Sequence, residues 1–212
     1  MQEDLLNFLK GLSKSCSHGS IHGNDCLNQV YTNVMSMLAC RGYAHNVSTC
    51  ETVDDVLEKM KKGQVIVTGT SLRGKGDVQV FFCLDGKVGI KFSRTIVEKL
   101  KDQAACIISL EGPTTFTKKD ARDHQNIQFM TFKQLFNDIS KHHLFRPHRA
   151  LNDAEKEEVM ARYNIQDESQ WPKLLQKDPA VVFHHFQKGE VIEIARRGVG
   201  GQEGTLYYRV VV

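Results

Sequence analysis

The sequence predicts two domains, an α/β domain followed by a small α+β domain. Between about residues 64 and 132, runs rich in β-branched residues alternate with helical patterns, which is typical of helices packed on a mixed sheet. Lys, His and Arg then crowd around Pro147 in residues 141–148, and the hydrophobic pattern starts again after them. We therefore expect domains over residues 1–142 and 143–212, since a chain of 212 residues is long enough for both.

Helical patterns come first in the N-terminal domain. Leucines at helical spacing predict a short amphipathic helix over residues 2–14, and residues 15–24 have the glycine, serine and histidine content of a loop. A longer helix is expected over residues 25–42, where an aspartate can cap the first turn and a glycine ends the pattern. A shorter helix is expected over residues 52–60.

The rest of this domain has mainly the period of strands. Residues 64–68 and 78–84 are short runs typical of strands, and Asp85-Gly86 is typical of a tight turn. We therefore expect residues 87–92 to return as the second strand of a hairpin. The remaining expected elements are a helix over residues 93–101 and strands over residues 104–110 and 127–132.

Local end signals organise the C-terminal domain. Asn152 and Glu155 form a capping box, which predicts a helix that continues to about Tyr163. Asp178-Pro179 predicts the start of a one-turn helix, because proline is favoured at the first helical position. Strands are expected over residues 191–194 and 205–212.

Composition and charge exclude several classes of protein. Hydrophobic residues make up 41% of the chain and charged residues 25%, which is typical of globular proteins. No run approaches 18 apolar residues, so no membrane contact is expected. The net charge is +3, and because residues 143–212 hold equal numbers of acidic and basic residues, the excess lies in residues 1–142. If any part of the chain contacts phosphates, residues 1–142 are therefore the better candidate, although charge alone favours a solvated surface of mixed charge.

The sequence contains no pattern that predicts a catalytic or metal-binding site. Gly-x-Ser-x-Gly, His-Glu-x-x-His and the Glu-x-Lys of many nucleases are absent, so no catalytic residue, cofactor or small-molecule substrate is expected. Cys16, His18, His22 and Cys26 have donors that zinc accepts. Their spacing matches no common zinc finger, so a loosely packed loop is favoured over a metal site.

A basic cluster follows Thr117. Lys118, Lys119 and Arg122 have the spacing of residues that share one face of a helix, which suits contact with phosphates. The alternative is an ordinary solvated helix face.

Several short segments, in order and at consistent distances, resemble a known family. In the C-terminal domain they are Leu144–His148, Ala161–Tyr163, Gln170–Lys173, Asp178–Ala180, Lys188–Ile192 and Tyr208–Val210. Together they resemble the fifth-largest subunit of eukaryotic nuclear RNA polymerases, which polymerases I, II and III share, and also the H subunit of archaeal RNA polymerase. Arg41–Tyr43, Val88–Lys91 on the expected return strand, and Phe116-Thr117 leading to Ala121 are similar to the jaw domain of that family.

The resemblance implies a non-catalytic subunit located in the nucleus, or in the nucleolus if it serves polymerase I. Its jaw domain would have an endonuclease-like fold without an active site and would lie beside downstream double-stranded DNA. The family's usual Thr-Pro-Ser-Ala loop, which approaches the duplex, matches Thr117–Ala121 here. The residues expected near DNA are Thr117, Lys118, Lys119 and Arg122.

The C-terminal domain would then be an assembly domain that docks on the largest subunit, next to other core subunits. Aromatic and arginine side chains dominate such interfaces, together with turn residues that shape them. The expected interface residues are His148, Asp178, Pro179, Gly189, Arg196, Tyr208 and Arg209.

The sequence also departs from the family pattern. Pro147 comes one place late, His185 replaces a glycine, Glu193 replaces a lysine, and residues 197–201 replace Ser and Thr. These differences indicate either a divergent paralogue confined to a single polymerase, such as polymerase I, or a chain from a lineage far from yeast and animals. Two further alternatives are a residual nuclease built on the jaw fold and a free-standing transcription adaptor.

Overall fold

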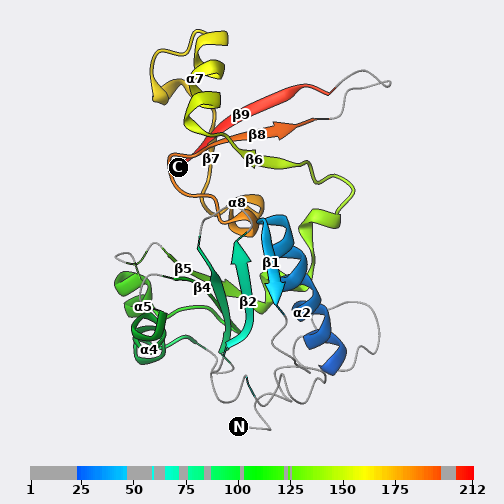
Figure 1. Ribbon diagram of the computed structural model, residues 1–212, viewed down its shortest axis with the longest axis vertical. Helices are drawn as coiled ribbons and strands as arrows, with labels where there is room; N and C mark the ends of the chain where they lie inside the picture. The colour runs from blue at the N-terminus through cyan, green and yellow to red at the C-terminus, as the bar shows by residue number, and fades with distance from the viewer. Residues whose placement is uncertain are drawn as a thin grey trace. The chain divides into compact units, whose positions relative to one another are not determined.

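The computed structural model describes residues 23–46, 59, 65–71, 76–83, 87–100, 103–121, 124, 126–196 and 204–212. The chain divides into two compact units, which we call the N-terminal unit (Met1–Asn137) and the C-terminal unit (Asp138–Val212) (Figure 1). The division lies close to the boundary predicted after residue 142. The helix expected over residues 2–14 lies outside the described residues, as does the one expected over 52–60 apart from Lys59.

The N-terminal unit contains a mixed sheet, as the sequence predicts, and this sheet has five strands. Its strands, in spatial order, are β1 (Tyr43–Asn46), β2 (Val65–Ser71), β3 (Val78–Cys83), β4 (Ala104–Ser109) and β5 (Ile127–Thr131). The first three pair antiparallel, whereas β3, β4 and β5 are parallel. β1 was not predicted, because four residues with little alternation carry almost no strand signal.

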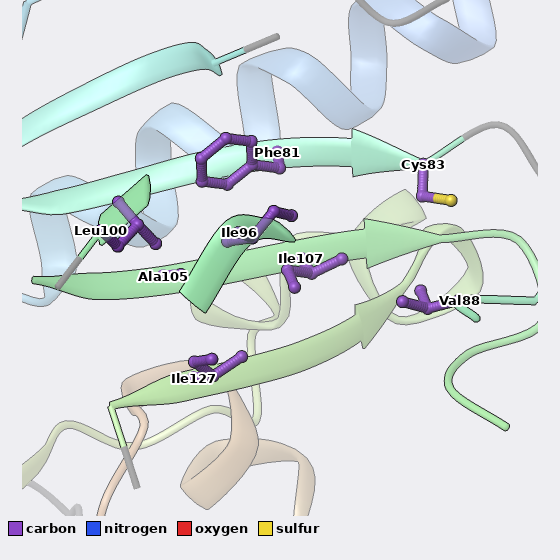
Figure 2. Close-up of a cluster of buried hydrophobic side chains, with 8 residues drawn as sticks. All are labelled: Phe81, Cys83, Val88, Ile96, Leu100, Ala105, Ile107 and Ile127. Carbon is purple, nitrogen blue, oxygen red and sulfur yellow. The ribbon is translucent and has the colours of Figure 1, made fainter. Parts of the chain in front are cut away.

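Helices lie on both sides of this sheet (Figure 1). They are α2 (Gly23–Cys40), α4 (Ile90–Leu100), α5 (Thr115–Asp120) and α6 (Phe132–Phe136). Consecutive residues of β3 and β4 are buried, as expected for strands covered on both faces. On one face, Ile96 and Leu100 of α4 pack against Phe81 and Ile107 (Figure 2). Phe82 makes an edge contact with Phe132 of α6 at 5.6 Å between ring centroids.

The predicted hairpin of residues 78–84 and 87–92 is wrong. Val88 makes only an isolated parallel bridge to Pro113, and α4 already begins at Ile90. The reason is that both edges of β3 are occupied, by β2 on one side and β4 on the other. Residues 87–92 therefore have no free edge of β3 to pair with, and the segment enters a helix instead of forming a strand.

A threonine cap ends β5 one residue earlier than expected. The Thr131 side chain accepts a hydrogen bond from the Gln134 backbone, and the Gln134 side chain accepts one from the Thr131 backbone at 2.8 Å. This capping box starts α6 at Phe132.

The C-terminal unit has a second sheet, of four strands. In spatial order the strands are β6 (His148–Ala150), β8 (Val191–Ala195), β9 (Leu206–Val211) and β7 (Lys173–Leu174). The helical elements are α7 (Asp153–Arg162), α8 (Pro179–His184) and two short 3-10 turns, η2 (Ile139–Lys141) and η3 (Glu168–Gln170). The predicted helices after Asn152 and Asp178 and the two predicted strands are confirmed.

Alternate residues of β8 and β9 pack into two separate clusters. Val191 and Val210 join Val159 of α7 and the buried Trp171. Ile192 and Val211 join Leu174 and Val181 of α8. Because neighbouring side chains of a strand point to opposite faces, this small sheet is covered by α7 on one face and α8 on the other. Within the part of the chain that the structure describes, no helix is both long and apolar enough for a membrane span.

Candidate functional site

The short helix α5 carries the residues expected near DNA, and Thr117 anchors it. Thr117 is fully buried, and its hydroxyl donates to the Val88 carbonyl at 2.9 Å. The Thr114 side chain caps the helix by accepting from the Thr117 backbone N–H, and the two hydroxyl oxygens lie 2.9 Å apart. The Thr117 side chain is therefore used inside the protein, whereas the neighbouring lysines are exposed charged groups of this helix.

An ion pair joins α5 to α4. The Arg94 guanidinium donates to the Asp120 carboxylate through two nitrogens, the shorter contact being 2.7 Å. This hydrogen bond lowers the pKa of Asp120 below its ordinary value. The ion pair neutralises the one carboxylate of α5 and holds the outer turn of the helix in place.

Lys118 and Lys119 are exposed at this position, and no ion pair involves either of them among the described residues. Arg122, the third basic residue of the predicted cluster, lies outside the described residues. Two uncompensated ammonium groups on an anchored helix can attract phosphates without regard to base sequence.

The described residues contain no group of three His, Cys, Asp or Glu side chains that could hold a metal ion. Of the candidate zinc ligands, Cys16, His18 and His22 lie outside the described residues, and Cys26 falls in α2, where only its backbone is described. Among the described thiols, Cys106 is buried in β4. Burial raises its pKa to about 11, so it stays protonated and is a poor nucleophile near neutral pH.

Several expected interface residues shape the C-terminal unit. Asp178 caps α8, since its carboxylate accepts from the Ala180 N–H at 2.8 Å, and Pro179 is the first residue of that helix. Gly189 has a φ of +91°, a conformation that glycine adopts without strain, and its N–H donates to the Val211 carbonyl. These three residues set the positions of α8 and of the turn before β8.

His148 belongs to a stack of rings at the start of β6. Its Nδ1 lies 2.6 Å from the Arg146 carbonyl oxygen, and its ring lies 5.3 Å from Phe145 and 6.3 Å from His184, between centroids. His184 in turn stacks on Phe186 at 5.1 Å. The stack joins the segment before β6 to the end of α8, so His148 also helps to hold these two parts of the unit together.

The remaining expected interface residues lie on or beside β9. The Arg196 guanidinium lies over the Tyr207 ring at 4.1 Å, a cation–π contact. Arg209 donates to the Lys173 carbonyl at 3.1 Å. Tyr208 lies beside Tyr163, with 5.9 Å between ring centroids, and burial followed by the charge of Glu193 raises its pKa.

Two exposed residues of this strand, Leu206 and Tyr207, were not among the predicted interface residues. Both lie next to the predicted anchors, and an apolar pair close to a glycine-rich turn is the signal that could have found them. Together with Arg196, they give the β8–β9 ribbon an exposed surface of mixed apolar and cationic character.

Glu193, where the resemblance leads us to expect a lysine, has a partner across the sheet. It lies opposite Arg149 in the register of β6 and β8, and the two side chains form an ion pair at 3.1 Å. Arg149 also pairs with Glu155, whose pKa is lowered first by the hydrogen bond from the Asn152 backbone and then by Arg149. The substitution is therefore matched by an arginine within the same unit.

Comparisons with known proteins agree with the resemblance. Residues 137–211 match the family model described as RNA polymerase Rpb5, C-terminal domain. A Caenorhabditis elegans protein named DNA-directed RNA polymerases I, II, and III subunit RPABC1 is 31% identical over 140 residues, which cover 63% of this chain and 65% of the relative. The protein of the same name in Dictyostelium discoideum is 29% identical over 127 residues, 56% of this chain and 64% of the relative.

An Arabidopsis thaliana protein named DNA-directed RNA polymerases IV and V subunit 5B is 29% identical over 122 residues, which cover 55% of this chain and 56% of the relative. The chain thus spans less than two thirds of the length of these relatives. The resemblance to this RNA polymerase subunit, first indicated by the short segments of the C-terminal domain, is confirmed.

Proposed function

Because residues 137–211 match the Rpb5 C-terminal domain, we propose that the protein is a non-catalytic structural subunit of a nuclear DNA-dependent RNA polymerase. The observation that carries this proposal is that the matched range nearly coincides with the compact unit Asp138–Val212. A range that folds as its own unit can act as a docking module in a larger assembly.

In this proposal the domain over residues 143–212 is the assembly domain and docks on the largest subunit, next to other core subunits. Its docking surface includes the exposed side chains of Arg196, Leu206 and Tyr207, with Tyr208 and Arg209 beside them. Aromatic and arginine side chains are the residue types that contribute most to protein interfaces, which supports this surface. His148, Asp178, Pro179 and Gly189 then act mainly by holding the unit in shape.

The domain over residues 1–142 is, in the same proposal, a jaw with an inactive endonuclease-like fold that lies beside downstream double-stranded DNA. The five-stranded mixed sheet with helices on both sides supports an α/β jaw. The exposed Lys118 and Lys119, with Thr117 anchoring their helix and Arg122 following it, support contact with phosphates.

We propose further that the protein lacks an active site, cofactor, metal or small-molecule substrate of its own. A magnesium-dependent cleavage assay on a plasmid and on a short duplex tests the rival nuclease. Cleavage above that of a mock preparation would contradict the proposal. The expected location is the nucleus, or the nucleolus for a component of polymerase I.

The alternative of a paralogue confined to one polymerase has one observation in its favour. Glu193 replaces a family lysine and is paired with Arg149, so this surface differs in charge without leaving a carboxylate unpaired. A docking surface with its own charge pattern can distinguish one largest subunit from another.

Affinity purification of a tagged copy from native extract tests the whole proposal. We expect the largest subunit of at least one nuclear RNA polymerase in the eluate, and a paralogue confined to one polymerase would bring down a single kind. Size-exclusion chromatography of the same extract distinguishes the free-standing adaptor, because a core subunit elutes with particles far larger than the chain itself.

A further inference from the structure

We propose that Phe116 makes a nonpolar contact with duplex DNA, in addition to the phosphate contacts proposed for Lys118 and Lys119. This inference rests on the proposed position of α5 beside downstream DNA and assigns a second kind of contact to the same helix. It follows from the exposure of Phe116, from its neighbours on the helix, and from the way in which the helix is anchored.

Phe116 is 74% exposed, although phenylalanine is among the residues most often buried in folded proteins. Among the described residues of the N-terminal unit, no other large hydrophobic side chain is exposed. A single exposed hydrophobic residue is common on protein surfaces and needs no explanation by itself. The place of this one on the surface is therefore what carries the inference.

The neighbours of Phe116 on α5 are cationic. Lys119 follows at a spacing of three residues, which places the two exposed side chains on the same side of the helix. Lys118 is also exposed, and the one carboxylate of the helix, Asp120, is engaged by Arg94. The outer face of α5 therefore combines an aromatic ring with two positive charges that form no ion pair within the described part of the chain.

The helix holds this face in a fixed orientation. Thr117 lies on the inner side, fully buried and hydrogen-bonded to Val88, while the Arg94–Asp120 ion pair fixes the last turn. Because the helix is already anchored, binding has to fix only the two side-chain torsion angles of Phe116. The loss of conformational entropy on binding is therefore small. The ring is therefore already presented for contact.

The chemistry of this face fits DNA. Positive charges alone would suit any polyanion, but in DNA the phosphates alternate with sugars that have apolar faces. In a duplex the faces of the bases are stacked, so a side chain held beside lysines reaches the sugars and the edge of the minor groove. Phe116 would cover this nonpolar surface while the lysines contact the flanking phosphates, and the contact would be independent of sequence.

Fluorescence anisotropy of the full chain with a labelled random-sequence duplex, measured at several salt concentrations, tests the inference. We expect Phe116→Ala to weaken DNA binding about tenfold at every salt concentration. A tenfold loss corresponds to about half of the free energy gained when a phenylalanine side chain is fully buried. The slope of log K against log salt should stay unchanged, since no counterion release is lost. Phe116→Leu should recover most of the affinity. An unchanged affinity for Phe116→Ala would overturn the inference.

Two lysine variants provide the matched controls. Lys118→Ala and Lys119→Ala should each reduce the salt slope by about 0.9, because each removes one phosphate contact. Lys133→Ala removes an exposed lysine of α6 in the same unit and should change the slope much less. If Phe116→Ala changed the slope as the lysine variants do, its effect would be electrostatic and the nonpolar contact would be refuted.

Affinity purification of the same variants separates this inference from the proposed function. If the wild-type chain failed to co-purify with a polymerase but lost DNA affinity on Phe116→Ala, the function would fail and the nonpolar contact would stand. If Phe116→Ala left DNA binding unchanged and weakened co-purification, the residue would contact a protein, and the inference would be wrong.

Discussion

Replacing Thr117 by valine should loosen α5 from the sheet while keeping the size and branching of the side chain. In the structure, the Thr117 hydroxyl donates to the Val88 carbonyl and lies 2.9 Å from the Thr114 hydroxyl. Valine removes both hydrogen bonds at a fully buried position. The Val88 carbonyl still accepts from the Thr114 backbone N–H at 3.2 Å, so it is not left without a donor.

The size of the effect follows from these contacts. A hydrogen bond inside a protein contributes about 0.5–1.5 kcal/mol net, so the loss of two should cost about 1–3 kcal/mol. The extra methyl group of valine offsets part of this cost through its transfer from water, about 0.8 kcal/mol for one such group. We therefore expect the free energy of unfolding of the N-terminal unit to fall by about 1–2 kcal/mol.

Urea unfolding followed by far-ultraviolet circular dichroism measures this change. With a slope of about 2 kcal/mol per molar urea, the middle of the usual range, the midpoint should fall by roughly 0.5–1 M. The chain has one tryptophan, Trp171, which is buried in the C-terminal unit, so its fluorescence reports on the other unit in the same sample. We expect the fluorescence transition to move less than the circular dichroism transition.

Thr115→Val is the matched control, because Thr115 is exposed on the same helix. It should change stability by no more than about 0.5 kcal/mol, as substitutions at exposed sites usually do. If Thr117→Val and Thr115→Val shifted the midpoint equally, the Thr117 hydroxyl would not anchor α5, and the reasoning would be refuted.

Three further predictions concern charged groups and thiols. Glu193→Lys should destabilise the C-terminal unit by about 1 kcal/mol more than Glu193→Gln, measured by Trp171 fluorescence in urea, because it sets two cations opposite each other across β6 and β8; equal effects would contradict this. Since Asp120 has a lowered pKa in the folded state, its ion pair stabilises the protein above the ordinary carboxyl pKa of 3.8, and the stability is lost as pH falls through the lower folded value. Asp120→Asn should therefore lower the free energy of unfolding at pH 7, and the difference from wild type should shrink progressively below pH 3.8. Finally, an alkylating reagent at pH 8 should modify the exposed Cys40 and spare the buried Cys106 until the protein unfolds, as judged by mass spectrometry of the peptides.

Elements that begin with a local signal could be predicted from the sequence. The helix after Asn152 and the helix after Asp178 both begin with a cap whose hydrogen bonds span two or three residues, and the structure contains both. The resemblance to a polymerase subunit also depended on short segments, and the comparisons confirm it. In each case the residues that carry the information are neighbours in the chain.

Local signals could not decide whether residues 78–84 and 87–92 form a hairpin. Its alternating pattern and its Asp-Gly turn are both real local signals for a strand pair. Whether a strand can form there depends on a free edge, and β4, which comes about twenty residues later in the chain, takes that edge of β3. Competition between segments for one edge is a property of the whole sheet.

For the candidate site too, some features could be predicted from neighbouring residues, whereas others depend on contacts between distant segments. From spacing alone, Thr117 and Lys118 both belong to a polar stretch suited to phosphate contact. Only the folded chain brings the Val88 carbonyl, 29 residues away, to the Thr117 hydroxyl, so that one residue becomes an anchor and the other stays exposed. The same is true of Glu193, whose partner Arg149 is 44 residues away.

The sequence alone was enough to predict the α/β and α+β character of the two domains, the helices with strong caps and the resemblance of the C-terminal unit to a polymerase subunit. Only the tertiary structure shows which polar side chains are hydrogen-bonded or ion-paired within the protein and which are exposed and available to a partner. The physical reason is that caps and turns are satisfied by atoms a few residues away, whereas burial and ion pairing depend on segments that become neighbours only when the chain folds.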